Sequence, residues 1–348
     1  MVEHASDDAI AHEPVMVREI IQGLALEVGN TVVDATAGRG GHAQAIAQAI
    51  GSGGTLLLLD LDENNLAFAS ARIRALPHAP RVIAVNDNFS TVAQVLRANA
   101  LCADAFLADL GFASNQMSDA ARGFSFAATG PLDMRLDQSK GESAQALLAR
   151  VSEAELADLI FQLGEDPFSR RIARRIMYVR DLGLLKTTTD LAKAVVSAYG
   201  VKARQSRMHP ATRTFMALRI AVNKELESLE TLLSVIQQEI ASFWPLPGQT
   251  FTPQATSTTG SPRHRHGVPV EEASPVIPNN CLSKNARIAI LAFHSLEDRL
   301  IKRAFTDWER QGWVTRIGRK PLVASEVECG ENPRSRSAKL RTVRIVGI

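Results

Sequence analysis

The chain has 348 residues, of which 45% are hydrophobic, so it is long and apolar enough to bury one large core or two moderate ones. Its 39 Lys and Arg nearly balance 37 Asp and Glu, so attraction to nucleic acid requires local clusters of positive charge. No apolar run reaches the roughly 20 residues of a membrane-spanning helix, and the acidic N-terminus lacks the pattern of a signal peptide.

The cysteines indicate the compartment. Cys102, Cys281 and Cys329 lie far apart and form no CxxC pair, a pattern that favours neither a zinc site nor a disulfide framework. We therefore expect a cytoplasmic protein without a structural metal.

The first third of the chain alternates short apolar runs with stretches typical of helices. This rhythm predicts an α/β fold with a parallel sheet. The predicted strands cover residues 31–35, 55–60, 81–85 and 105–109.

Three of these predicted strands end in an acidic residue, namely Asp34, Asp60 and Asp109. The carboxyl ends of the strands face the ligand crevice in open α/β sheets. The three carboxylates are therefore expected to meet at one rim.

The glycine-rich turn after the first strand, DATAGRGGH (34–42), distinguishes between ligand classes. It lacks the GxxxxGK of a phosphate-binding loop and the third glycine of a dinucleotide fingerprint. S-adenosylmethionine suits the acidic rim better, since its ammonium and sulfonium are cationic and its ribose diol can donate to Asp60. For Asp34, capping of the following turn by its own side chain stays an open alternative.

Helices are expected beyond Asp109. Residues from about 115 to 210 are predicted to form a loop and short helices, as an insertion in the sheet domain. From Thr214, apolar residues recur every three or four positions as far as Ile240, which predicts one long helix. The runs 286–292 and 339–346 are predicted to resume the sheet, the second as an edge strand.

The tract at 245–284 is rich in Pro, Ser and Thr and shows neither helical nor strand periodicity, so we expect a flexible insertion. It contains His264 and His266. Two histidines without a nearby carboxylate or cysteine do not predict a metal site, and we expect both to be solvated.

Many short motifs, in order over nearly the whole chain, resemble the MraW/RsmH family of 16S ribosomal RNA cytosine N4-methyltransferases. Besides DATAGRGGH, they are HEPV (12–15), DLD (60–62), NFS (88–90), DLG (109–111), RGFSF (122–126), GPLDMR (130–135), HPATRTF (209–215), ALRIAVNKEL (217–226), FHSLEDR (293–299), KP (320–321) and NPRSRSAKLR (332–341).

The resemblance implies a class I, Rossmann-like methyltransferase with a mostly parallel twisted sheet. It implies a methyltransferase domain in two parts, 1–114 and 213–348, around a helical substrate-recognition insertion at 115–212. The implied reaction transfers a methyl group from S-adenosylmethionine to N4 of a cytidine, position 1402, in 16S rRNA of the small ribosomal subunit. By matching position, the implied cofactor contacts are Gly40, Gly41, His42, Asp60, Phe89, Asp109 and Gln116.

Asp109 is the predicted catalytic residue, with anchoring of the cofactor as the alternative role. The chain departs from the family pattern at Phe112, Ala113 and Asn115, inside the loop expected to shape the cytosine pocket. Methylation of another nucleic acid or a small molecule, or a non-catalytic role in ribosome assembly, stays open at this point.

Other residues are candidates for contact with RNA. Phe124 and Phe126 suit either stacking on an unstacked base or packing of the insertion. His294 lies after the fifth predicted strand, where it faces the crevice or begins a helix. The basic groups suit either phosphates or a solvated surface; they are Arg170, Arg171, Arg174 and Arg175, and Arg334, Arg336, Lys339 and Arg341.

Overall fold

The structure, a computed structural model, describes residues 14–205, 208–244 and 280–347. The tract predicted at 245–284 therefore lies outside the described residues as far as residue 279, and so do His264 and His266. Its last residues belong to a strand, β5, which begins at Leu282, four positions before the predicted start.

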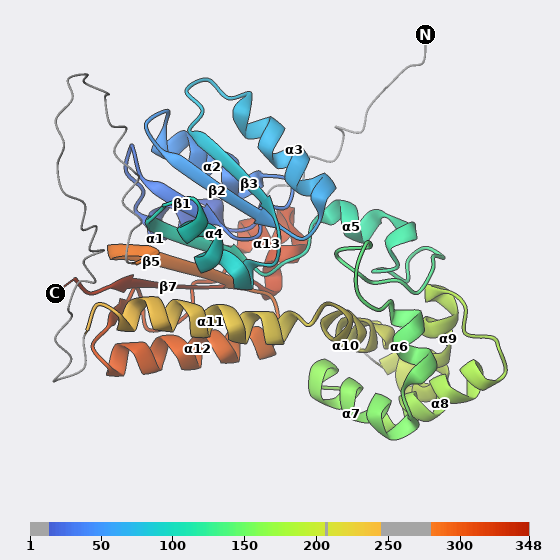
Figure 1. The fold of residues 1–348 in the computed structure, drawn as a ribbon. Coiled ribbons are helices and arrows are strands. Elements are labelled where there is room, and N and C mark those ends of the chain that lie inside the picture. Colours follow the sequence, from blue (N-terminus) through green and yellow to red (C-terminus); the bar gives the residue numbers. More distant parts are fainter. Residues whose placement is uncertain (1–13, 206–207, 245–279, 348) are drawn as a thin grey trace, which may run out of the picture.

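Seven strands form one sheet in the order β3-β2-β1-β4-β5-β7-β6 (Figure 1). The first five pair in parallel, and β7 runs antiparallel to both of its neighbours. This mostly parallel sheet confirms the predicted α/β fold of a class I methyltransferase. The strands are β1 (Thr31–Asp34), β2 (Thr55–Asp60), β3 (Arg81–Asn86), β4 (Ala103–Asp109), β5 (Leu282–Ala292), β6 (Val314–Arg316) and β7 (Lys339–Ile345).

Helices cover both faces of the sheet, so the middle of a central strand is apolar on both sides. In β2, Leu56 and Leu58 face one core and Leu57 and Leu59 the other, and all four are fully buried. One face packs against α1 (Val17–Leu24), α2 (Gly41–Ile50) and α3 (Glu63–Arg74). The other packs against α4 (Val92–Ala98), α11 (Glu225–Ala241) and α12 (Ser295–Arg310).

The prediction that the last strand lies at the edge is wrong. β7 lies between β5 and β6, and the three-residue β6 is the outer strand. Val343 and Ile345 of β7 are fully buried, as expected of an inner strand. A run as short as β6 is too brief to show a strand period in the sequence.

A second group of helices has its own core beyond the end of the sheet (Figure 1). Capping boxes at Ser152 and Thr187 fix the starts of two of them. The helices are α6 (Ala144–Arg150), α7 (Glu153–Gly164), α8 (Ser169–Asp181), α9 (Thr188–Tyr199) and α10 (Ala211–Asn223). Two short helices, α5 (Ser114–Ser118) and α13 (Glu326–Glu331), flank the sheet domain.

The prediction of one long helix from Thr214 is also wrong. The chain breaks at Lys224, which adopts the left-handed conformation with φ 51° and ψ 40° between α10 and α11. Phe215 packs in the helical core, whereas Leu229 and Leu233 pack in the sheet core. The apolar residues after Thr214 thus keep one helical period although they pack in two separate cores. Periodicity alone does not show at which residue the chain passes from the first core to the second.

The left-handed conformation of Lys224 leads to a prediction for the free energy of unfolding. Replacing Lys224 with Val is expected to lower the free energy of unfolding by about 1–2 kcal/mol, because a β-branched residue fits the left-handed conformation poorly. Lys224→Gly is expected to be at least as stable as wild type. Denaturant unfolding measures both.

The control is Glu230→Val at an exposed position of α11 beyond its first turn, where helix propensity changes and a loss of about 0.5 kcal/mol is expected. Equal losses for the two Val variants would contradict the left-handed break.

Candidate active site

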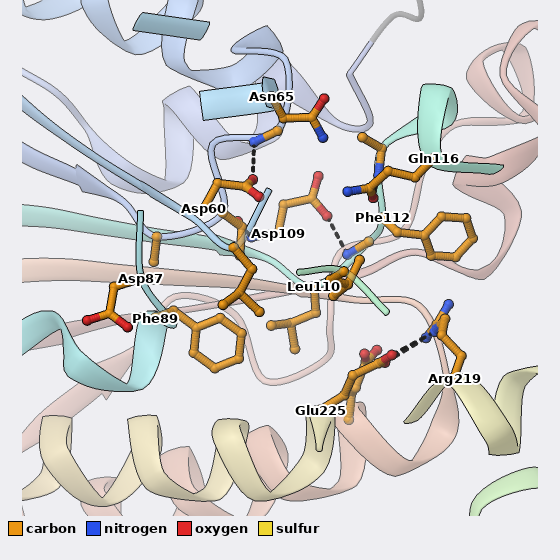
Figure 2. Close-up of a pocket in the computed structure, with 18 residues that line it drawn as sticks. Asp60, Asn65, Asp87, Phe89, Asp109, Leu110, Phe112, Gln116, Arg219 and Glu225 are labelled. Carbon is orange, nitrogen blue, oxygen red and sulfur yellow. Dashed lines mark hydrogen bonds and ion pairs between the residues drawn. The ribbon is translucent and has the colours of Figure 1, made fainter. Parts of the chain in front are cut away.

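A cavity of about 100 Å³ lies at the carboxyl ends of the first four strands, beside the segment that follows β4 (Figure 2). Acidic side chains on the sheet side face an ion pair from the break between α10 and α11. The principal lining residues are Thr36, Gly38, Asp60, Asp87, Phe89, Asp109, Gly111, Phe112, Gln116, Leu136, Arg219, Glu225 and Glu297.

The cavity brings together four of the predicted site residues, namely Asp60, Phe89, Asp109 and Gln116. The other three, Gly40, Gly41 and His42, do not line it.

Close packing explains why glycine occupies positions 40 and 41. A Cβ on Gly41 would lie 2.9 Å from the Pro14 ring, and one on Gly40 would lie 3.1 Å from Ala69. Gly40 also has φ +79°, a conformation that L side chains rarely adopt. Both glycines thus let the turn pack closely on the protein, and this turn presents Gly38 to the cavity.

Asp60 is held by backbone donors. Its Oδ2 accepts the Gly38 N–H at 2.7 Å, and its Oδ1 accepts the Asp62 N–H at 2.8 Å. Burial raises the pKa of Asp60 to about 6, although both hydrogen bonds oppose this rise. The carboxylate is therefore fixed in position and gains from any cationic or hydroxyl donor placed beside it.

Asp109 lies at the end of β4, next to His42. Its Oδ1 accepts the Gly111 N–H at 2.9 Å, and its Oδ2 lies 3.4 Å from His42 Nδ1. Burial raises the pKa of Asp109, and the neighbouring imidazole counteracts part of this rise. The side chain keeps 19% of its surface exposed, so it is accessible from the cavity.

Asp34 lies behind the cavity, and its side chain accepts the Thr36 N–H at 3.2 Å, as in the capping alternative. Its Oδ2 has no hydrogen-bond partner among the described residues, although the side chain is buried. Burial raises the pKa of Asp34 to about 6. Asp34 therefore adds to the negative potential of the site without lining it.

Gln116 stiffens the loop after β4. Its Nε2 donates to Asp62 Oδ2 at 3.0 Å, while its Oε1 accepts the Ala113 N–H at 3.1 Å. Burial favours the neutral form of Asp62, but hydrogen bonds from Gln116 and Arg122 outweigh this and hold the pKa of Asp62 below its ordinary value. The predicted cofactor contact thus also holds the cavity wall in place.

Sequence reasoning missed the ion pair opposite Asp109. Arg219 Nε and Nη2 each donate to Glu225 at 2.8 Å, across the break at Lys224 (Figure 2). The Arg219 guanidinium also lies 4.8 Å from the centroid of the Phe112 ring. Both charged residues belong to the ALRIAVNKEL motif, but spacing along one continuous helix did not indicate that they pair.

Glu225, His294 and Glu297 bring potential metal ligands within 4.8 Å of one another. Arg219 already occupies both oxygens of Glu225, and His294 caps α12 by accepting the Glu297 N–H. These contacts account for the group as an ion pair beside a helix start, which was one of the two expectations for His294.

None of the described helices combines the length and the hydrophobicity that crossing a bilayer requires.

The chain is similar to known proteins over nearly its whole length. The sequence pattern of the MraW methylase family matches residues 9–243 and 271–346.

Three curated relatives carry the name ribosomal RNA small subunit methyltransferase H. The protein of Acidobacterium capsulatum is 39% identical, over 95% of this chain and 97% of its own length. The relative from Sorangium cellulosum is 41% identical, over 97% of this chain and 91% of its own length. The relative from Synechococcus sp. strain WH7803 is 41% identical, over 98% of this chain and 96% of its own length.

The buried Asp34 makes the stability of the protein depend on pH. Its pKa is about 6 in the fold against an ordinary 3.8, so its ionisation destabilises the fold as pH rises from about 4 through about 6. Asp34→Asn is expected to remove this loss, which corresponds to roughly 3 kcal/mol above pH 7.

Denaturant unfolding of both proteins between pH 4 and 8 measures the effect. The difference at the lowest pH reports the packing effect of the substitution alone. A difference in stability that stays constant over this range would contradict the burial of an ionisable Asp34.

Proposed function

The chain belongs to the MraW methylase family, and we propose that this methyltransferase transfers a methyl group from S-adenosylmethionine to N4 of a cytidine in 16S ribosomal RNA, at position 1402. The observation that carries the proposal is the acidic cavity at the carboxyl ends of the strands. The relatives named ribosomal RNA small subunit methyltransferase H support the small-subunit RNA as the substrate.

The residues of the cavity fit the cofactor. Burial raises the pKa of Asp34, Asp60 and Asp109, so a cationic ligand relieves the unfavourable free energy of their ionisation. A pyrophosphate placed there adds further negative charge. S-adenosylmethionine, when bound, supplies a methyl group on a positively charged sulfur, which is already activated for transfer.

Each lining residue then has a role. Asp60, fixed by two backbone donors, accepts from the ribose hydroxyls, and Phe89 offers an apolar surface to the adenine. Asp109 lies beside the reacting atoms. Gln116 holds the loop that separates cofactor and acceptor, while Gly40 and Gly41 support the Gly38 turn from behind.

Phe112 marks the acceptor side of the cavity. The centroid of its ring lies 4.8 Å from the guanidinium of Arg219, 5.7 Å from that of Arg334 and 6.3 Å from the centroid of the nearly parallel Phe124 ring. A flipped cytosine requires such a flat surface, because unstacking it from RNA costs a few kcal/mol. We assign Phe112 to this contact, and Phe124 to support it from the helical core.

The helical insertion at 115–212 is the part we assign to RNA recognition. Arg170, Arg171 and Arg174 are exposed on α8, where they can reach phosphates. Arg175 lies over the ring of Tyr178, itself 55% exposed. Action on the small ribosomal subunit supports the cytoplasmic location that we expect from the sequence.

The substrate can be tested directly. Purified protein is incubated with methyl-labelled S-adenosylmethionine and small ribosomal subunits from a strain that lacks this methylation, and the RNA is digested to nucleosides. Label in N4-methylcytidine from position 1402 is expected. Label in another nucleoside, in competing DNA or in small molecules would reject the proposed substrate, and absence of cofactor binding would favour a non-catalytic assembly factor.

The assignment of Asp60 makes a separate prediction. Asp60→Asn keeps the shape but loses the charge, so we expect at least about tenfold weaker binding of S-adenosylmethionine, since hydrogen bonds to charged groups contribute roughly 1.5–3 kcal/mol. Binding of 16S RNA is expected to be unchanged. Calorimetry and filter binding measure the two affinities.

Asp158→Asn, at an exposed position of α7, is the matched control and is expected to behave as wild type in both assays. If Asp60→Asn weakens both ligands equally, the ribose assignment is wrong.

A further inference from the structure

His42 lies in the first turn of α2, directly behind the cavity wall. Its side chain is only 8% exposed, and it does not line the cavity. Nδ1 lies 3.4 Å from Asp109 Oδ2, and Nε2 lies 2.8 Å from the carbonyl oxygen of Val15. The imidazole therefore connects a fixed backbone acceptor to the carboxylate that faces the cavity.

These contacts determine the tautomer. The carbonyl of Val15 can only accept, so His42 Nε2 must carry a hydrogen. In the neutral imidazole, Nδ1 then presents a lone pair to the carboxylate of Asp109. Two lone pairs repel each other, and the contact becomes attractive when one proton lies between the two atoms. Asp109 and His42 therefore bind a proton as a pair and not as independent groups.

His294 and Glu297 provide a contrast within the same site. His294 Nδ1 accepts the Glu297 N–H at 3.5 Å, so its Nε2 carries the hydrogen, and this nitrogen lies 3.0 Å from Glu297 Oε1. A neutral His294 thus presents an N–H, and not a lone pair, toward this carboxylate, although its Nε2 makes no hydrogen bond among the described residues. Of these two contacts between a histidine and a carboxylate, the one between His42 and Asp109 places a lone pair opposite the carboxylate.

We infer that His42 is a positioning residue that completes a proton-accepting pair with Asp109 during methyl transfer. The inference rests on the proposed function. As N4 of the cytosine bonds to the methyl carbon, the carbon–sulfur bond breaks and its electron pair stays on sulfur. N4 then holds one proton too many. This proton passes to Asp109, is shared with His42 Nδ1, and leaves to water before the next turnover.

The charged groups around the pair allow it both to accept and to release a proton. Asp34 and Glu297 add negative charge that favours the proton, whereas Arg334 on the segment before β7 opposes it. The surrounding charges therefore hold the pair neither fully protonated nor fully deprotonated.

Two variants separate proton acceptance from structure. In His42→Gln, the side-chain amide can replace Nε2 as donor to Val15, but it cannot hold a proton. We expect kcat for methyl transfer to fall about 10²-fold with the Kd for S-adenosylmethionine nearly unchanged. The acid limb of the kcat profile is expected to shift, because the first proton then binds to Asp109 alone.

His42→Asn places an amide near the position of Nδ1 and loses the contact with Val15, so it is expected to lose both kcat and stability. His78→Asn, on an exposed turn after α3, is the control histidine and is expected to match wild type. If His42→Gln keeps the wild-type kcat and the wild-type acid limb, His42 has only a structural role and the inference is overturned.

A measurement without substrate keeps the two proposals distinguishable. Long-range proton–nitrogen NMR of histidine-labelled protein is expected to show a hydrogen on His42 Nε2, and an Nδ1 signal that changes when Asp109→Asn replaces the carboxylate with an amide. If the Asp109→Asn substitution leaves the His42 nitrogen signals unchanged, the two side chains do not share a proton and the inference is overturned. If the wild-type protein does not methylate the RNA, the proposed function is rejected, but the NMR measurement still tests the contact between His42 and Asp109.

Discussion

The site depends on the burial of carboxylates at the carboxyl ends of neighbouring strands. Asp34, Asp60 and Asp109 each end a strand in the middle of the sheet, where helices cover both faces and water is largely excluded. Desolvation therefore raises the pKa of all three. Backbone N–H groups of the adjoining turns hold them in place but compensate only part of the cost. A cationic methyl donor supplies the remaining compensation, and this links the fold to the choice of cofactor.

The same constraint explains the glycine-rich turn. Its conformation and close packing place the Gly38 N–H on Asp60 and bring His42 behind Asp109. A turn that grips phosphate presents several free N–H groups to its ligand. Here a carboxylate of the protein takes up the Gly38 N–H, so the turn organises negative charge and does not neutralise it in a ligand.

The opposite wall of the site depends on the junction of two cores. The break at Lys224 ends α10 in the helical core and begins α11 on the sheet, and the Arg219–Glu225 ion pair spans it beside the cavity. Facing walls of the cavity are thus carried by separately packed bodies. Under the proposed function, the relative position of the two bodies decides the geometry of the transfer.

The sequence by itself determined the parallel sheet, the acidic strand ends and the class of cofactor, because strand periodicity and the last residue of each strand are local properties of the chain. It also placed Asp60, Phe89, Asp109 and Gln116 at the cavity. Only the tertiary structure decided that β7 lies inside the sheet, that the apolar stripe after Thr214 is divided between two cores, and that His42 lies behind Asp109. These features depend on contacts between segments far apart in the chain, whose partners no local period or spacing can identify.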